Sequence, residues 1–94
     1  MAYTTKQPAE VRIRRAMYRS HRRGTREMDV LLGAFAERYL PTFDESQLVR
    51  FETLLEHGDP DLFDWMTARE TVPREHDHDV MRLLRDFALN RPAR

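Results

Sequence analysis

The chain has no cysteine and no long hydrophobic run, and both absences narrow its chemistry. Without cysteine it cannot form a disulfide, an iron–sulfur cluster, a thiolate zinc site or a cysteine nucleophile. No apolar stretch approaches the roughly 20 residues that a membrane-spanning helix requires, and no signal-peptide hydrophobic segment follows the first charges. A chain of 94 residues has room for one core. We therefore expect one small domain without membrane insertion.

An excess of one charge is also lacking, because 16 basic residues balance 16 acidic ones. The two signs are nevertheless separated along the chain. Residues 1–26 carry eight basic groups and one acidic group, and residues 27–94 carry eight basic and fifteen acidic groups. The basic end could attract an acidic or phosphorylated partner. The alternative is a helix whose charge is partly compensated by the acidic part of the folded chain.

The apolar spacing predicts an all-α fold, a compact five-helix bundle in a single small domain. We expect a flexible N-terminal tail at residues 1–7 and the five-helix domain over residues 8–94. The first helix should begin after Pro8, which suits a first helical position because its missing N–H would be unpaired there. It should run to about Arg22, and Gly24 can end it. Its apolar residues form only a ragged stripe among arginines.

The second helix has the clearest pattern, because five apolar residues recur on one face at 3.6 residues per turn. Pro41 closes the segment. Gly33 lies in its middle at a cost of up to about 1 kcal/mol relative to alanine, which predicts close packing against a neighbour. We expect Met28, Leu31, Leu32 and Phe35 of this stripe to belong to the core and not to a site. Its members are Met28, Leu31, Leu32, Phe35 and Tyr39.

The later helices are defined by their ends. Asp44 and Gln47 predict a capping box at the start of the third helix, and Gly58 is predicted to occupy its left-handed C-cap. Asp59 and Pro60 then predict the N-cap and first turn of a short fourth helix, which should end before Pro73. The fifth helix is predicted from the apolar residues Val80, Leu83, Leu84 and Phe87.

No complete catalytic set is present, so we predict that the protein is not an enzyme. The histidines and aspartates of residues 76–79 could suggest a metal site, but neighbouring residues point in different directions, and we interpret them as a polar loop and N-cap. His21 and His57 are isolated and are interpreted as surface or helix-end histidines. We predict no bound metal.

The junction at residues 21–29 combines groups suited to recognition. Gly24 has no side chain to block a close approach, Arg23 offers a planar fork of five donors for a carboxylate or phosphate, and Glu27 is an acceptor within one helical turn. The alternative is a C-cap glycine followed by first-turn acids.

The residues Arg23-Gly24-Thr25-Arg26-Glu27 resemble the Arg-Gly-x-x-Glu motif of the succinate dehydrogenase assembly factors that promote flavinylation. The second-helix pattern that follows the motif also resembles this family. So do three later segments, and the match extends over about residues 11–90. These segments are residues 51–55, residues 59–62 and Trp65.

The resemblance implies an assembly factor, or chaperone, that binds the flavoprotein subunit of succinate dehydrogenase and promotes covalent attachment of FAD to it. Fumarate reductase stays open as a second client. The factor itself would bind no FAD stably. We expect a monomer in the bacterial cytoplasm, with the mitochondrial matrix as the eukaryotic equivalent. The implied partner-binding residues are Arg23, Gly24 and Glu27, with Arg22 and Arg26 beside them.

A second hypothesis is a small helical nucleic-acid-binding module that uses the arginine-rich first helix. Such binding should weaken steeply with salt, whereas client binding should depend chiefly on Gly24 and Glu27. The absence of a clear recognition helix and the net negative charge after residue 26 argue against nucleic acid as a partner. A metal-dependent function, which would need His76 and His78, ranks last.

Overall fold

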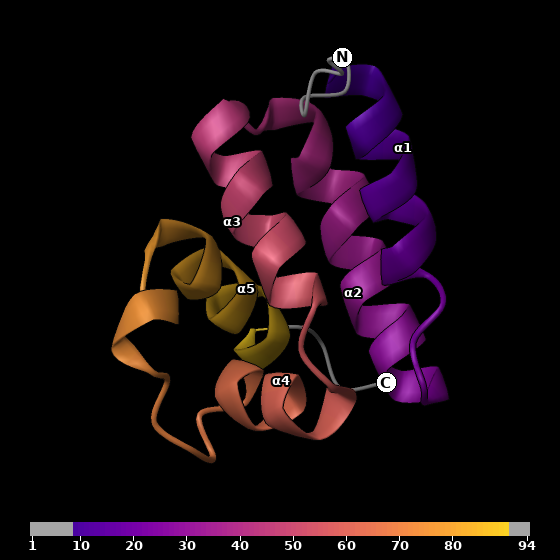
Figure 1. Ribbon diagram of the computed structural model, residues 1–94. Helices are drawn as coiled ribbons and strands as arrows, with labels where there is room; N and C mark the ends of the chain where they lie inside the picture. Colours follow the sequence, from indigo (N-terminus) through magenta and orange to yellow (C-terminus); the bar gives the residue numbers. More distant parts are fainter. Residues whose placement is uncertain (1–8, 91–94) are drawn as a thin grey trace.

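The computed structural model describes residues 9–90, and within this range the predicted all-α fold with five α-helices is confirmed (Figure 1). The tail predicted at residues 1–7 lies outside the described part of the chain. The helices are α1 (Ala9–Ser20), α2 (Arg26–Tyr39), α3 (Glu45–Leu55), α4 (Asp59–Met66) and α5 (Asp79–Leu89), with two short 3-10 helices, η1 (Leu40–Thr42) and η2 (Arg74–His76).

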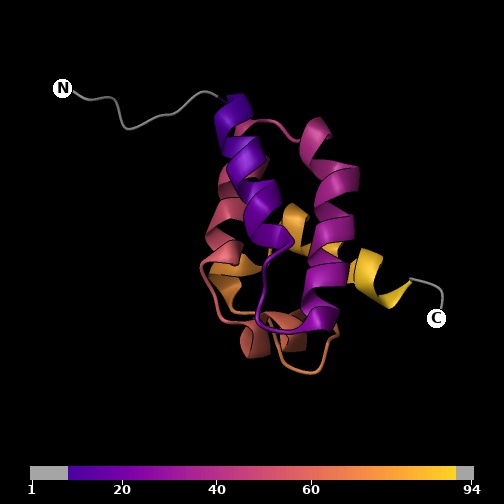
Figure 2. The same cartoon turned by 90° about the vertical axis from the view of Figure 1, so that its right-hand side faces the viewer.

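The helices pack so that α4 lies at the end of the bundle where α1 connects to α2. Helix α1 packs against both α2 and α3, while α5 packs against α3 and α4. Figure 2 shows α1 and α2 side by side, with their connection passing close to α4. Residues 21–25 and the start of α4 are therefore neighbours in space although they are far apart in sequence.

Phe35 lies at the centre of the aromatic part of the core and is fully buried. Its ring centroid lies between 4.9 and 6.2 Å from those of four other aromatic side chains. Burying a phenylalanine contributes about 1.5–3 kcal/mol, and tilted or edge-on ring pairs add to this. The core therefore draws on α2, α3, α5 and the segment after η1. The four partners of Phe35 are Tyr39, Phe43, Phe51 and Phe87.

The start of α3 was predicted correctly, but the end of that helix was not. Asp44 accepts from the Gln47 N–H and the Gln47 side chain accepts from the Asp44 N–H, so the capping box is confirmed. Gly58 does not occupy a left-handed C-cap, because its φ is −70°. The last helical residue of α3 is Leu55, and Gly58 instead provides the extended N-cap of α4. A tight connection leaves no room for a separate left-handed turn.

The first helix ends at Ser20, earlier than predicted, and Thr25 caps the start of α2 by accepting from the Met28 N–H at 3.2 Å. No glycine in residues 9–90 adopts a positive φ, so Gly24 is not a left-handed helix stop. The close packing predicted at Gly33 is confirmed. A Cβ atom there would lie 2.5 Å from two ring atoms of His21.

The face of α1 that packs against α3 is built around a buried arginine. The Arg12 guanidinium contacts the Glu52 carboxylate at 2.6 and 3.1 Å and the Glu45 carboxylate at 2.6 Å. These hydrogen bonds, from Glu52 first and Glu45 second, raise the pKa of Arg12 further above its usual range. The apolar stripe of α1 is as ragged as predicted, with Ala16 buried and Tyr18 60% exposed.

We predict that Arg12→Ala lowers the free energy of unfolding by about 2 kcal/mol, because it leaves two carboxylates without their shared partner. Arg14 lies two residues further along α1 and is exposed, so Arg14→Ala should change the free energy of unfolding by less than about 0.5 kcal/mol. Urea denaturation of both variants measures the difference. Equal effects would show that the Arg12 network contributes nothing beyond a surface arginine.

Candidate functional site

The Arg23 side chain is turned into the molecule, where it joins the α1–α2 connection to the α3–α4 connection. Its Nε lies 2.8 Å from Asp59 Oδ1, and its two terminal nitrogens donate to the backbone carbonyls of Leu55 at 3.2 Å and His57 at 2.8 Å. Only 9% of the Arg23 side chain and 13% of the Asp59 side chain are exposed. The guanidinium fork is thus used for bonds within the chain.

The same aspartate also holds the backbone of the motif glycine. Asp59 Oδ2 accepts from the Gly24 N–H at 2.5 Å, and a Cβ atom at Gly24 would lie 2.9 Å from this oxygen. The Arg23 N–H donates to the Asp29 carboxylate. The lack of a side chain at Gly24 therefore permits a close approach, but the group that approaches is a carboxylate of this chain.

Asp59 was predicted as the N-cap of α4, and this prediction is wrong. Gly58 is the N-cap, and Asp59 is the first residue of the helix. Its carboxylate is oriented toward Arg23 and Gly24, because a guanidinium and an amide N–H together provide charge-assisted hydrogen bonds. Sequence reasoning had assigned the acid to a cap and the arginine to a partner protein, and so missed that they bind each other.

The other candidate residues of the motif face solvent. Glu27, Arg22 and Arg26 are exposed, and the Arg22 guanidinium lies over the Tyr18 ring, 4.8 Å from its centroid. Among residues 9–90 the Glu27 carboxylate has no hydrogen-bond or ion-pair partner. Its predicted role in binding a partner stays a prediction, and its carboxylate is available for that role.

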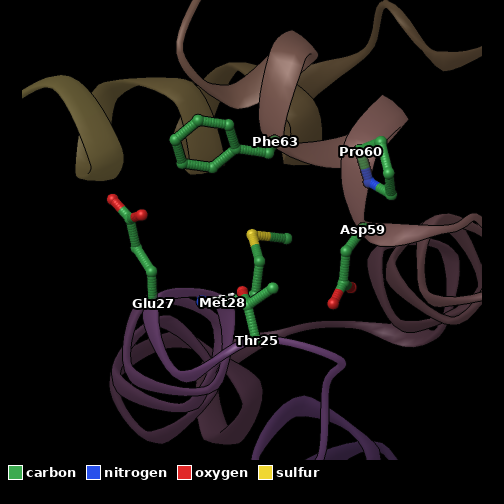
Figure 3. A pocket seen from close by; sticks show the side chains of 6 residues that line it. All are labelled: Thr25, Glu27, Met28, Asp59, Pro60 and Phe63. Carbon is green, nitrogen blue, oxygen red and sulfur yellow. Dashed lines mark hydrogen bonds between the residues drawn. The ribbon is translucent and has the colours of Figure 1, made fainter.

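A groove of about 240 Å³ lies beside the motif, between the start of α2 and the start of α4 (Figure 3). Three apolar side chains and the carboxylates of Glu27 and Asp59 line it, together with Thr25. The carboxylates lie on opposite sides of the view, with the Met28 sulfur between them and Phe63 across from it. The apolar lining residues are Met28, Pro60 and Phe63.

Met28 belongs both to the core and to the lining of the groove. It is only 2% exposed, which confirms its predicted place in the core, and it also lines the groove. Methionine is flexible and polarisable and suits adaptable contact surfaces. Pro60 and Phe63 were missed as lining residues, because only the fold brings α4 next to the motif.

The histidines form contacts within the fold. His57 and His76 are not isolated, since their rings lie 4.5 Å apart and both pack near Trp65. His78 is the N-cap of α5 and accepts from the Met81 N–H at 3.2 Å, as the N-cap interpretation of this segment proposed. His21 lies 3.0 Å from a Glu37 carboxylate oxygen. Within the described range no group of three or more metal-ligating side chains comes together.

We predict that Asp59→Ala lowers the free energy of unfolding by about 2–3 kcal/mol, because it leaves the buried Arg23 guanidinium without its carboxylate. Asp61→Ala is the matched control, since Asp61 is also in the first turn of α4 but is exposed. It should cost less than about 0.5 kcal/mol. Urea denaturation compares the two, and similar losses would contradict a specific bond between Asp59 and Arg23.

We also predict that stability falls as the pH drops below about 6.5, where an imidazole of an unfolded chain takes up a proton. Desolvation and the Arg50 guanidinium lower the pKa of His78 in the folded protein. The unfolded state then binds more protons than the folded state, so acid favours unfolding. His78→Asn keeps an N-cap acceptor that does not titrate. Urea denaturation at about pH 7.5 and about pH 5.5 should show a smaller loss for this variant than for wild type.

Residues 14–88 match the family model described as flavinator of succinate dehydrogenase.

None of the helices between residues 9 and 90 combines the length and apolar content needed to cross a membrane.

Two relatives illustrate the similarity to known proteins. The mitochondrial succinate dehydrogenase assembly factor 2-B of Drosophila ananassae is 36% identical over 86 residues, which are 89% of this chain and 53% of the relative. The mitochondrial succinate dehydrogenase assembly factor 2 of Dictyostelium discoideum is 37% identical over 79 residues, which are 84% of this chain and 56% of the relative. The chain thus spans about half the length of these relatives.

Proposed function

Because the chain belongs to the family of succinate dehydrogenase flavinators, we propose that it is an assembly factor for succinate dehydrogenase. Its client is the flavoprotein subunit, and it promotes covalent attachment of FAD to that subunit. The observation that carries this proposal is the family match over residues 14–88, which includes the motif residues Arg23, Gly24 and Glu27. Relatives named as succinate dehydrogenase assembly factors support it.

The bond between FAD and the client forms by chemistry of the client and the flavin, and the factor is not an enzyme. The arrangement of the motif supports this view, because Arg23 and Asp59 are engaged with each other and with backbone groups. The groove of about 240 Å³ has room for one side chain and not for a dinucleotide. In this proposal FAD is cargo held by the client, and the factor stabilises a client conformation that is competent for attachment.

The contact surface comprises exposed Glu27, the neighbouring groove and the flanking arginines Arg22 and Arg26. Arg23 and Gly24 act as positioning residues, because their bonds to Asp59 set how α4 is placed against the motif. The compartment is the mitochondrial matrix in a eukaryote, as the relatives' names suggest, and the cytoplasm in a bacterium. The working form is a monomer.

Nothing in the comparisons favours the nucleic-acid alternative, and the fold reduces the charge available for it. Arg12, Arg19 and Arg23 lie close to carboxylates of later helices. The compensation of the basic end by the acidic part of the chain is thus confirmed for these three arginines. Arg14, Arg15 and Arg22 remain exposed.

We predict that Gly24→Arg abolishes the complex with the purified flavoprotein subunit, because the new side chain enters the space beside Asp59 and places a cation at the contact surface. The helical circular dichroism should be retained. Thr71→Arg, in an exposed loop, is the matched control and should bind like wild type. Size-exclusion chromatography of the mixed proteins measures the complex. Complex formation by Gly24→Arg would overturn the role of this surface.

A further inference from the structure

We propose that the groove beside the motif binds one long cationic side chain of the client, an arginine, with its aliphatic stem on the apolar lining and its guanidinium at Glu27. This inference rests on the proposed function and specifies the chemistry that the contact surface recognises. It is carried by one juxtaposition: an apolar groove of about 240 Å³ with a carboxylate at its rim that has no partner among residues 9–90.

The size and lining of the groove suit a side chain of this kind. A cavity of about 150 Å³ can hold a benzene molecule, so the groove has room for a longer side chain that remains partly open to solvent. Met28, Pro60 and Phe63 supply the apolar surface (Figure 3). Arginine buries a three-carbon stem along such a surface while its charged head reaches a polar group.

The balance of charges makes the groove an acceptor for a cation. The negative charge of Asp59 is matched by Arg23 at 2.8 Å, so Asp59 adds little net charge to the groove. The Glu27 carboxylate is exposed and unmatched among the described residues. The Phe63 ring already has one guanidinium near it, because Arg69 lies 5.5 Å from the ring centroid. Because the charge of Arg69 opposes a second cation at this ring, the preference for a cation rests on Glu27, and Phe63 supplies apolar surface for the stem of the side chain.

An apolar client side chain is the competing occupant, and the carboxylate at the rim disfavours it. Docking a protein over the groove removes water from Glu27, and an ionised carboxylate that loses water without gaining a partner costs free energy. A guanidinium supplies that partner as a charge-assisted, bidentate donor. The groove lining alone would accept either occupant, so Glu27 decides between them.

The test measures binding of the full-length protein to the purified flavoprotein subunit by isothermal titration calorimetry at low and high salt. Glu27→Gln and Phe63→Ala should each weaken binding about tenfold or more. The double variant should lose less than the product of the two effects, because both residues contact one side chain. Binding by Glu27→Gln should also depend less on salt than binding by wild type.

Controls and alternative outcomes separate this inference from the proposed function. Glu75→Gln and Leu89→Ala remove an exposed carboxylate and an exposed apolar side chain elsewhere and should bind like wild type. If Phe63→Ala does not fold, Phe63→Leu keeps apolar volume without the planar ring and should still weaken binding. If wild type binds but Glu27→Gln binds equally well with unchanged salt dependence, the occupant is apolar and the inference is overturned. If wild type does not bind the subunit, the proposed function itself fails.

Discussion

The bond between Arg23 and Asp59 is the interaction on which the arrangement of the site depends. It joins two residues that are 36 positions apart in sequence, and the same arginine binds the carbonyl of Leu55 at the end of α3 and that of His57 in the following turn. A nearly buried guanidinium needs a carboxylate partner, because an unpaired charge in this position would cost about 2–3 kcal/mol. The bond holds the start of α4 beside the start of α2, where the groove lies.

The motif therefore divides into an inner part and an outer part. Arg23 and Gly24 both bind Asp59; the Arg23 side chain is largely buried, whereas Gly24 is exposed. Glu27 lies one turn further along and is exposed at the rim of the groove. A substitution in the inner part should act on stability and geometry together, whereas a substitution at Glu27 should act on recognition. These two kinds of effect can be separated by measuring folding and binding on the same variants.

Much of the fold could be predicted from local patterns, because capping boxes and apolar spacing act within a few residues. The start of α3 at Asp44 and the apolar stripe of α2 are examples. The site could be predicted only in part. The motif singles out Glu27 as a candidate, which stays a prediction, and the pairing of Arg23 with Asp59 depends on tertiary contacts that no local pattern encodes. Asp59 followed by Pro60 predicts a helix cap when only the local sequence is considered. Phe63 can be identified as a lining residue of the groove only once the fold places α4 beside α2.

The most direct test of this account is covalent flavin fluorescence of the succinate dehydrogenase flavoprotein subunit in a denaturing gel. The subunit would be taken from cells with the gene, without it, and with Glu27→Ala or the control Glu75→Ala in its place. We expect loss of the signal in the deletion and with Glu27→Ala, and an unchanged signal with Glu75→Ala. An unchanged signal in both the deletion and Glu27→Ala would contradict it and direct attention to the exposed arginines of α1.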